Sequence, residues 1–182
     1  MRLENAFEVP APRDDAWRLL NDVPAVVPCM PGAELVEVAG ENEWKAKLHV
    51  KLGPIALQFL ADVTREEMDE GGGRVVLAVK AREAKGRGSA DATIESRLSG
   101  REGGTQVEIA TDLELRGAVA QYGRGVVPDV ATRLTDQFAR CIAAKLADGG
   151  SETSPSAVPA PVGGLRLVFA ALWSSLSRRA RR

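Results

Sequence analysis

Most of the first 116 residues of this 182-residue chain alternate between apolar and polar side chains, and this pattern constrains the fold more than any other feature. Five runs with apolar residues at every second position begin at Trp44, Ile55, Val75, Ala90 and Val107. Glycines stand between the runs, where they favour turns. Such runs are typical of strands with one buried and one wet face, so the sequence predicts an antiparallel meander.

Shorter signals precede the meander. Residues 3–9 alternate in the same way and predict one more strand. Pro12 and Arg13 begin a stretch with an apolar helical side, and Asp22 and Pro24 suit the N-terminus of a second short helix. The N-terminal part should therefore form a strand and two short helices.

After Gly117 the apolar residues recur at three and four positions, which predicts a helix from about Val119 to Leu146. Pro128 lies inside this range, and it either kinks the helix or marks a second start. The whole order is one strand, two short helices, about six strands and one long helix. The simplest α+β packing lays the long helix across one face of a curved sheet.

Many inward positions of the expected sheet carry small side chains, namely Asn5, Ala46, Ala61, Ala81, Ala90, Ala92, Ser96 and Thr111. Small residues under a helix either leave an apolar cavity of ligand size or let the helix sit closer to the sheet. We expect a cavity, lined by Leu48, Val50, Leu57, Phe59, Leu77, Val79, Ala92, Ile94, Ile109, Leu113, Tyr122, Val126, Val130 and Leu134.

The last residues predict a separate element. An apolar stripe at helical spacing is followed by four arginines, so residues 165–182 should form an amphipathic helix on an anionic membrane surface. The apolar run from Leu165 to Leu176 is too short to span a bilayer, which needs about 20 residues. Packing on a partner protein or on the chain's own domain are the alternatives. The expected membrane contacts are Leu165, Val168, Phe169, Leu172, Trp173, Leu176, Arg178, Arg179, Arg181 and Arg182.

Composition divides the chain into three parts. Residues 148–164 are rich in Pro, Ser and Gly and should form a disordered linker between a ligand-binding domain at 1–147 and the helix at 165–182. Residues 151–182 hold five arginines and one acid, so the first 150 residues hold 19 bases and 24 acids. An acidic domain argues against nucleic acid as a partner, because phosphate binding needs a basic face.

Cys29 and Cys141 follow no metal-ligand spacing, and we expect two buried free thiols in a reducing compartment. The N-terminus has no apolar segment of the kind that signals secretion. These observations predict a cytoplasmic domain, held peripherally at the inner face of the cell membrane by its tail.

Signals for catalysis are weak. His49 is the one histidine and lies on the wet side of its strand, so neither a nucleophile–histidine pair nor a zinc site is expected. The paired glycines lie between strands and not before a helix, which makes them turns and not phosphate loops. We therefore expect no catalytic residue, no metal site and no covalently bound cofactor.

Two segments resemble a known family. Residues 115–125 read LRGAVAQYGRG, and residues 28–35 read PCMPGAEL. Together with the order of strands and helices, they resemble the carbon monoxide dehydrogenase CoxG family of the START-like helix-grip (SRPBCC) superfamily, over roughly residues 1–147. The resemblance implies seven antiparallel strands that grip the long C-terminal helix around an apolar cavity. It also implies a non-catalytic role beside a molybdenum-containing enzyme of the carbon monoxide dehydrogenase type.

Tyr122 stands where the family pattern often has Phe, and its hydroxyl suits a hydrogen bond to a ligand at the pocket mouth, with Gln121 and Arg124 as polar neighbours. Helix capping and surface pairing are the alternative roles of these three residues. The expected ligand is lipid-like, and our specific hypothesis is an isoprenoid quinone, because a redox partner needs an electron acceptor. Two alternatives stay open. One is an assembly or recruitment factor that tethers the enzyme to the membrane without ligand transfer, and the other is an enzyme, since some helix-grip proteins are cyclases or hydrolases.

Overall fold

The computed structural model describes residues 1–52, 55–122 and 125–149. The expected membrane helix and nearly all of the expected linker lie outside the described residues. The elements follow one another as β1 (Arg2–Val9), α1 (Arg13–Asn21), α2 (Val23–Val26), η1 (Val27–Cys29), β2 (Ala33–Gly40), β3 (Glu43–Leu52), β4 (Ile55–Asp69), β5 (Arg74–Glu83), β6 (Gly88–Arg101), β7 (Gly104–Gly117), η2 (Ala118–Tyr122) and α3 (Val127–Ala147).

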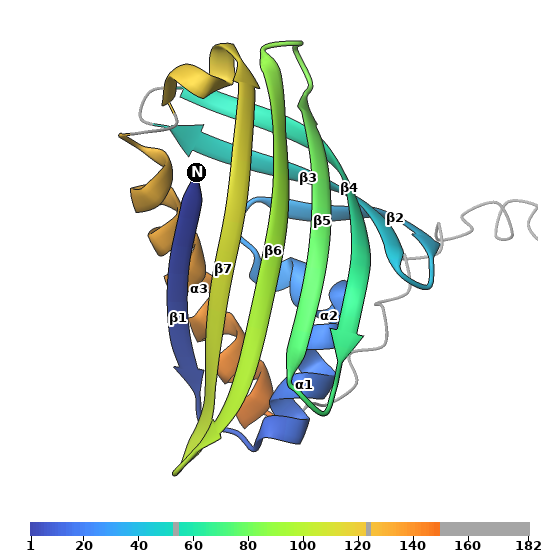
Figure 1. The fold of residues 1–182 in the computed structure, drawn as a ribbon, viewed down its shortest axis with the longest axis vertical. Coiled ribbons are helices and arrows are strands. Elements are labelled where there is room, and N and C mark those ends of the chain that lie inside the picture. Colours follow the sequence, from blue (N-terminus) through green and yellow to red (C-terminus); the bar gives the residue numbers. More distant parts are fainter. Residues whose placement is uncertain (53–54, 123–124, 150–182) are drawn as a thin grey trace, which may run out of the picture. The chain divides into compact units, whose positions relative to one another are not determined.

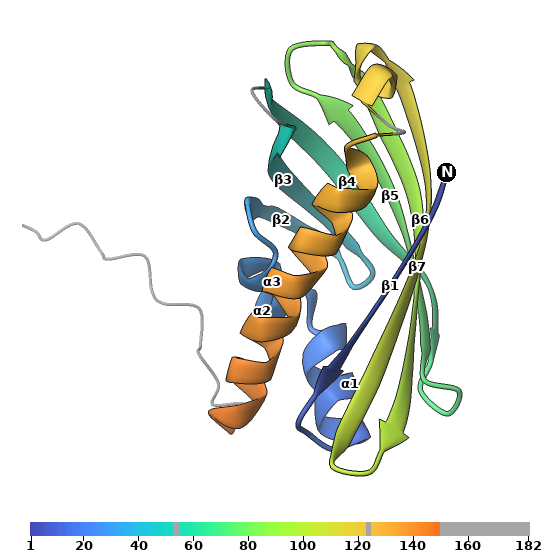
Figure 2. The ribbon, with the colours of Figure 1, turned by 90° about the vertical axis from the view of Figure 1, so that its left-hand side faces the viewer.

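The seven strands form one antiparallel sheet in the order β1-β7-β6-β5-β4-β3-β2 (Figure 1). The first strand of the chain therefore pairs with the last one, next to the long helix. Figure 2 shows α3 crossing one face of the curved sheet, with α1 near one end of that face. This arrangement confirms the predicted α+β helix-grip fold and the predicted order of its elements.

Glycine is required where β6 begins and β7 ends. Gly88 and Gly117 are paired across the two strands, and their φ angles are +143° and +75°. A Cβ atom on Gly117 would lie 2.9 Å from the Cα of Gly88. Only glycine combines these backbone angles with so close an approach, so the chain can leave β7 here and turn into η2.

The long helix begins later than predicted. Residues 118–122 form the short 3-10 helix η2, and α3 begins at Val127 with Pro128 in its first turn. Proline has no N–H to donate to a preceding turn, so it is tolerated where that donor would be unpaired anyway. The prediction of one helix from Val119 is therefore wrong, and the alternative that Pro128 marks a second start is confirmed.

Two apolar clusters lie between the helices and the sheet. The α1-side cluster joins α1, η1, α3 and strands β1, β5, β6 and β7, and its buried members are Val9, Ala16, Trp17, Cys29, Val75, Leu98, Val107 and Ile142. The η2-side cluster has the buried members Leu57, Phe59, Ala81 and Val119. Phe7 of β1 meets Phe138 of α3 edge to face, with ring centroids 6.0 Å apart. The C-terminal half of α3 is thus fixed to the sheet through the α1-side cluster.

Cys29 and Cys141 form a disulfide, which contradicts the prediction of two free thiols. Cys29 lies in η1 and Cys141 in α3, 112 residues apart in the sequence and 5.3 Å apart between their Cα atoms. Sequence spacing does not reveal this pair, because only the packing of η1 against α3 brings the two sulfurs together. Disulfides persist mainly in oxidising environments, so the cysteines no longer support a reducing compartment.

Candidate functional site

The fourteen residues expected to line a cavity fall into three groups. Eight belong to the η2-side cluster or pack against it: Leu48, Val50, Leu57, Phe59, Val79, Tyr122, Val126 and Val130. Leu77 and Ile109 pack against the α1-side cluster. Four are half-buried and pack against neither cluster: Ala92, Ile94, Leu113 and Leu134. We call these four residues the belt, since they come from the middle parts of β6, β7 and α3.

A row of alanines crosses four strands beside the belt. Ala46 of β3 pairs with Ala61 of β4, which in turn pairs with Ala81 of β5. Ala81 also pairs with Ala90 of β6. Residues directly opposite each other on antiparallel strands share one face of the sheet. Because Ala81 is buried in the η2-side cluster, the whole alanine row faces the interior.

Close approach of α3 does not account for the alanine row. The backbone of α3 comes nearest to β1, η1 and α1, whereas the alanines lie on β3 to β6. Val126 and Val130 of this chain segment do pack against the η2-side cluster, yet both remain half-buried. The small side chains therefore favour incomplete filling over tight helix packing, which were the two readings of the sequence.

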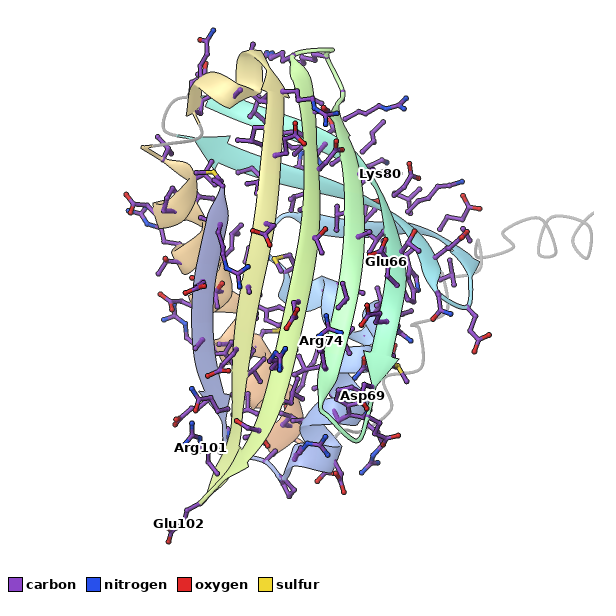
Figure 3. All side chains as sticks on the ribbon, in the orientation of Figure 1. Glu66, Asp69, Arg74, Lys80, Arg101 and Glu102 are labelled. Atoms are coloured by element: carbon purple, nitrogen blue, oxygen red, sulfur yellow. A yellow bond between two sulfur atoms is a disulfide. The ribbon has the colours of Figure 1, made fainter. Side chains whose placement is uncertain are left out.

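Two surface hollows of the described structure lie elsewhere. One of about 210 Å³ is at the β6–β7 turn, beside Arg101 and Glu102 (Figure 3). The other, of about 560 Å³, lies along β1, β7 and β6 beside Arg2, Glu95 and Glu108. Neither hollow is lined by α3, so a closed cavity beneath that helix stays a prediction. Its support is the alanine row together with the half-buried belt.

Of the polar residues expected at the pocket mouth, Tyr122 alone is placed at the interior. It is half-buried and packs against the η2-side cluster, whereas Gln121 is exposed. Arg124 lies outside the described residues. The structure instead gathers three other polar side chains on the inward face: Asn5, Ser96 and Thr111. The sequence shows them at apolar positions of their strands, but not that they are neighbours.

Two charged residues at inward positions serve the fold. Glu83 is 5% exposed, and its carboxylate accepts the backbone N–H groups of Lys85 at 2.9 Å and Arg87 at 3.1 Å. Burial opposes ionisation, but these N–H groups still hold the pKa of Glu83 below its ordinary value. Arg65 lies over the Trp44 ring, 5.0 Å from its centroid, and donates to the Asn21 carbonyl at 2.7 Å. Both are thus committed to turns and packing, which leaves them poorly suited to acid–base catalysis.

The remaining residues with catalytic potential do not converge. His49 is exposed on β3, as the alternation predicted. Within the described ranges, no group of three or more His, Cys, Asp or Glu side chains could hold a metal ion. What the inward face presents is apolar surface with neutral polar groups, an arrangement that fits binding of a hydrophobic molecule.

The outer face of the sheet carries a charged network. Arg74 of β5 is ion-paired with Glu67 and, at 3.1 Å, with Glu95, while Glu95 also accepts from Arg97 at 2.7 Å (Figure 3). The hydrogen bond from Arg74, followed by the one from Arg97, lowers the pKa of Glu95 from 4.5 to about 2. This network ties β4, β5 and β6 together on the side away from α3.

Acid should weaken this network. A carboxyl whose pKa is lowered by folding stabilises the protein above its unfolded pKa, and that contribution is lost as the pH falls toward the folded value. Replacing Glu95 by Gln should therefore make the urea midpoint less sensitive to pH between 4.5 and about 2. Glu66→Gln, at an exposed position of β4, should keep the pH dependence of the natural sequence. Equal pH dependence for Glu95→Gln and the unaltered protein would contradict this account.

A model of the carbon monoxide dehydrogenase CoxG family matches residues 6–147. The chain belongs to this family. No curated protein matches this CoxG-family chain. Among solved structures it is similar to a conserved protein from Geobacillus kaustophilus, with 22% identity, a TM-score of 0.73, and coverage of 82% of this chain and 97% of that one.

Two more distant structures share the fold of this CoxG-family protein. A Thermus thermophilus protein has 14% identity and a TM-score of 0.60, with 83% of this chain and all of that one covered (100%). The Zhui aromatase/cyclase from Streptomyces sp. R1128 has 17% identity and a TM-score of 0.57, with 85% and 98% covered. At such identities the similarity shows the helix-grip fold alone, and the family match carries the link to carbon monoxide dehydrogenase.

Proposed function

We propose that this protein is a non-catalytic accessory protein of a molybdenum hydroxylase of the carbon monoxide dehydrogenase type, and that it binds a lipid-like molecule between α3 and the sheet. The alanine row carries the proposal, because it faces the interior on strands that the α3 backbone does not approach closely. The half-buried belt continues this apolar surface toward the middle of the sheet. Family membership supports the association with carbon monoxide dehydrogenase.

Within this proposal the ligand is an isoprenoid quinone. The partner is a redox enzyme and needs an electron acceptor, and quinones dissolve in the membrane. An interior of alanine, valine and leucine side chains suits an isoprenoid chain, because burial of apolar surface drives such binding. The protein would shield the quinone from water between the bilayer and the enzyme.

Lipids extracted from the purified full-length protein test the ligand directly. Mass spectrometry should find a quinone, and added quinone should bind to protein from which lipid has been removed. Ala61→Trp would fill the alanine row and should abolish binding, whereas Leu60→Trp places the same side chain at the neighbouring position, which is 49% exposed. Binding that survives Ala61→Trp, or no quinone binding by the unaltered protein, would refute this proposal.

The membrane part of the proposal concerns the tail at 165–182, which lies outside the described residues. Within the described residues, no helix is long and apolar enough to cross a bilayer. We propose that the tail docks reversibly on an anionic surface at the inner face of the cell membrane. The Cys29–Cys141 disulfide gives no support to that side of the membrane, although Cys29 is only 4% exposed and thus shielded from reductants.

Liposome sedimentation tests the tail. Trp173→Asp should weaken pelleting with anionic vesicles at least tenfold, because burying the indole contributes roughly 2 kcal/mol and a carboxylate opposes insertion. Replacing Arg178, Arg179, Arg181 and Arg182 by Gln should weaken binding and remove its salt dependence, since each cation contributes about 1 kcal/mol at such a surface. Unchanged pelleting of both variants would rule out membrane docking through the tail.

A second candidate function is recruitment of the enzyme to the membrane without ligand transfer. The two surface hollows favour it, because neither lies beneath α3. This function requires that the partner enzyme float with membranes in the presence of the full chain and not after deletion of residues 163–182. It differs from the first candidate in predicting that Ala61→Trp leaves enzyme activity in cells unchanged.

A further inference from the structure

Three neutral polar side chains lie next to one another on the inward face of the sheet. Asn5 of β1 and Ser96 of β6 both pair with Ile109 of β7, one from each side. Thr111 is the next inward residue of β7 and pairs with Leu3 and Ile94. Diagonal neighbours on adjacent strands are about 7–8 Å apart, so Thr111 is close to both of the others. We call Asn5, Ser96 and Thr111 the polar triad.

The triad has no partner within the protein. None of its three side chains makes a hydrogen bond in the described part of the chain, and each is half-buried. Among the described residues, the Arg65 Nε is the single side-chain nitrogen or oxygen that is sealed from solvent without a partner. The polar atoms of the triad must therefore border space that a solvent molecule or a ligand can reach. Polar groups placed among apolar side chains need such a partner, because leaving them unpaired is unfavourable.

The surroundings of the triad define what can bind there. Ile94, a belt residue, is opposite Thr111, and Ile109 lies between Asn5 and Ser96. The charged residue at an inward position in the same row, Arg65, uses its guanidinium on Asn21 and Trp44. Hydroxyl and carboxamide groups both donate and accept hydrogen bonds but carry no charge. They suit a carbonyl or hydroxyl on a hydrophobic skeleton, and not a carboxylate or phosphate.

We propose that the polar triad binds the uncharged oxygen-bearing end of the ligand, while the rest of the ligand extends along the belt to the alanine row. Thr111 and Leu115, which is opposite Ala90, are four residues apart on β7, so the two regions are about 14 Å apart along the sheet. The ligand's polar end therefore lies in the middle of the sheet, and its apolar end points toward η2. This inference rests on the proposed function and adds the recognition residues and the orientation of the ligand.

The test compares two probes that differ only in their oxygens. Decylubiquinone and decylbenzene are titrated into the full-length protein by displacement of a fluorescent apolar dye. Thr111→Val and Ser96→Ala remove the hydroxyls with little change in shape, and Asn5→Leu removes the carboxamide. Each should weaken decylubiquinone about three- to tenfold, as expected for one hydrogen bond, and leave decylbenzene unchanged. Thr93→Val, at an exposed position of β6 between two belt residues, should change neither affinity.

The two probes separate the inference from the proposed function. Equal loss for both probes, or unchanged decylubiquinone affinity in all three variants, would overturn the role of the triad and leave apolar binding intact. Binding of neither probe to the unaltered protein would overturn the proposed function and the triad with it. Thermal midpoints of Thr111→Val and Ser96→Ala should not fall, because these variants remove polar groups that have no partner in the protein.

Discussion

Removing the Cys29–Cys141 disulfide should lower the free energy of unfolding by about 3–5 kcal/mol. The bond closes a loop with a sequence separation of 112 residues, and cross-linking a loop of about 100 residues restricts the unfolded chain by about 4.7 kcal/mol. For a domain of this size the thermal midpoint should fall by roughly 10 °C. The measurement is thermal unfolding of the Cys29→Ala/Cys141→Ala variant beside the unaltered protein.

Two controls make this result specific. A reductant should lower the midpoint of the unaltered protein and leave that of the double variant unchanged. Thiol titration of the native protein should find no free thiol, and titration after unfolding and reduction should find the two cysteines of the sequence. Two reactive thiols in unfolded protein that has never been reduced would contradict the disulfide and restore the expectation from the sequence.

Ile142→Ala should cost about 2–5 kcal/mol of stability, the usual range for truncating a fully buried branched side chain. Ile142 has 0% exposure and lies in α3, next to Cys141 and within the α1-side cluster. The lost methyl groups leave a void at the point where the helix is held to the sheet, since the surrounding side chains cannot fully collapse. Chemical unfolding in urea measures the effect.

Leu60→Ala is the matched control for this truncation. Leu60 is 49% exposed on β4, so its removal should change stability by less than about 0.5 kcal/mol. A small effect of Ile142→Ala, comparable with that of Leu60→Ala, would show that α3 is not anchored through the α1-side cluster.

The alternation of the sequence was sufficient to predict most of the sheet. The runs that begin at Trp44, Ile55, Val75, Ala90 and Val107 became β3 to β7, because each strand has one face toward the interior and one toward water. β2 has no such clear pattern. It is an edge strand with irregular register on both sides of Val38, and that residue is 58% exposed. Edge position and bulges remove the period of two on which the prediction depends.

The interior was harder to predict, because it depends on which residues become neighbours. The sequence shows that Ala46, Ala61, Ala81 and Ala90 are small, but only strand register places them in one row. The same holds for the polar triad and the disulfide, whose members come from distant segments. The start of α3 depended on a local choice between two roles of Pro128, and the sequence alone did not decide between them.

A crystal structure of the protein soaked with decylubiquinone tests the central claim most directly. The account predicts electron density between α3 and the sheet, with the quinone ring beside Asn5, Ser96 and Thr111 and the alkyl chain over the alanine row. Water or the protein's own side chains in that space, with the quinone bound elsewhere or not at all, would contradict it.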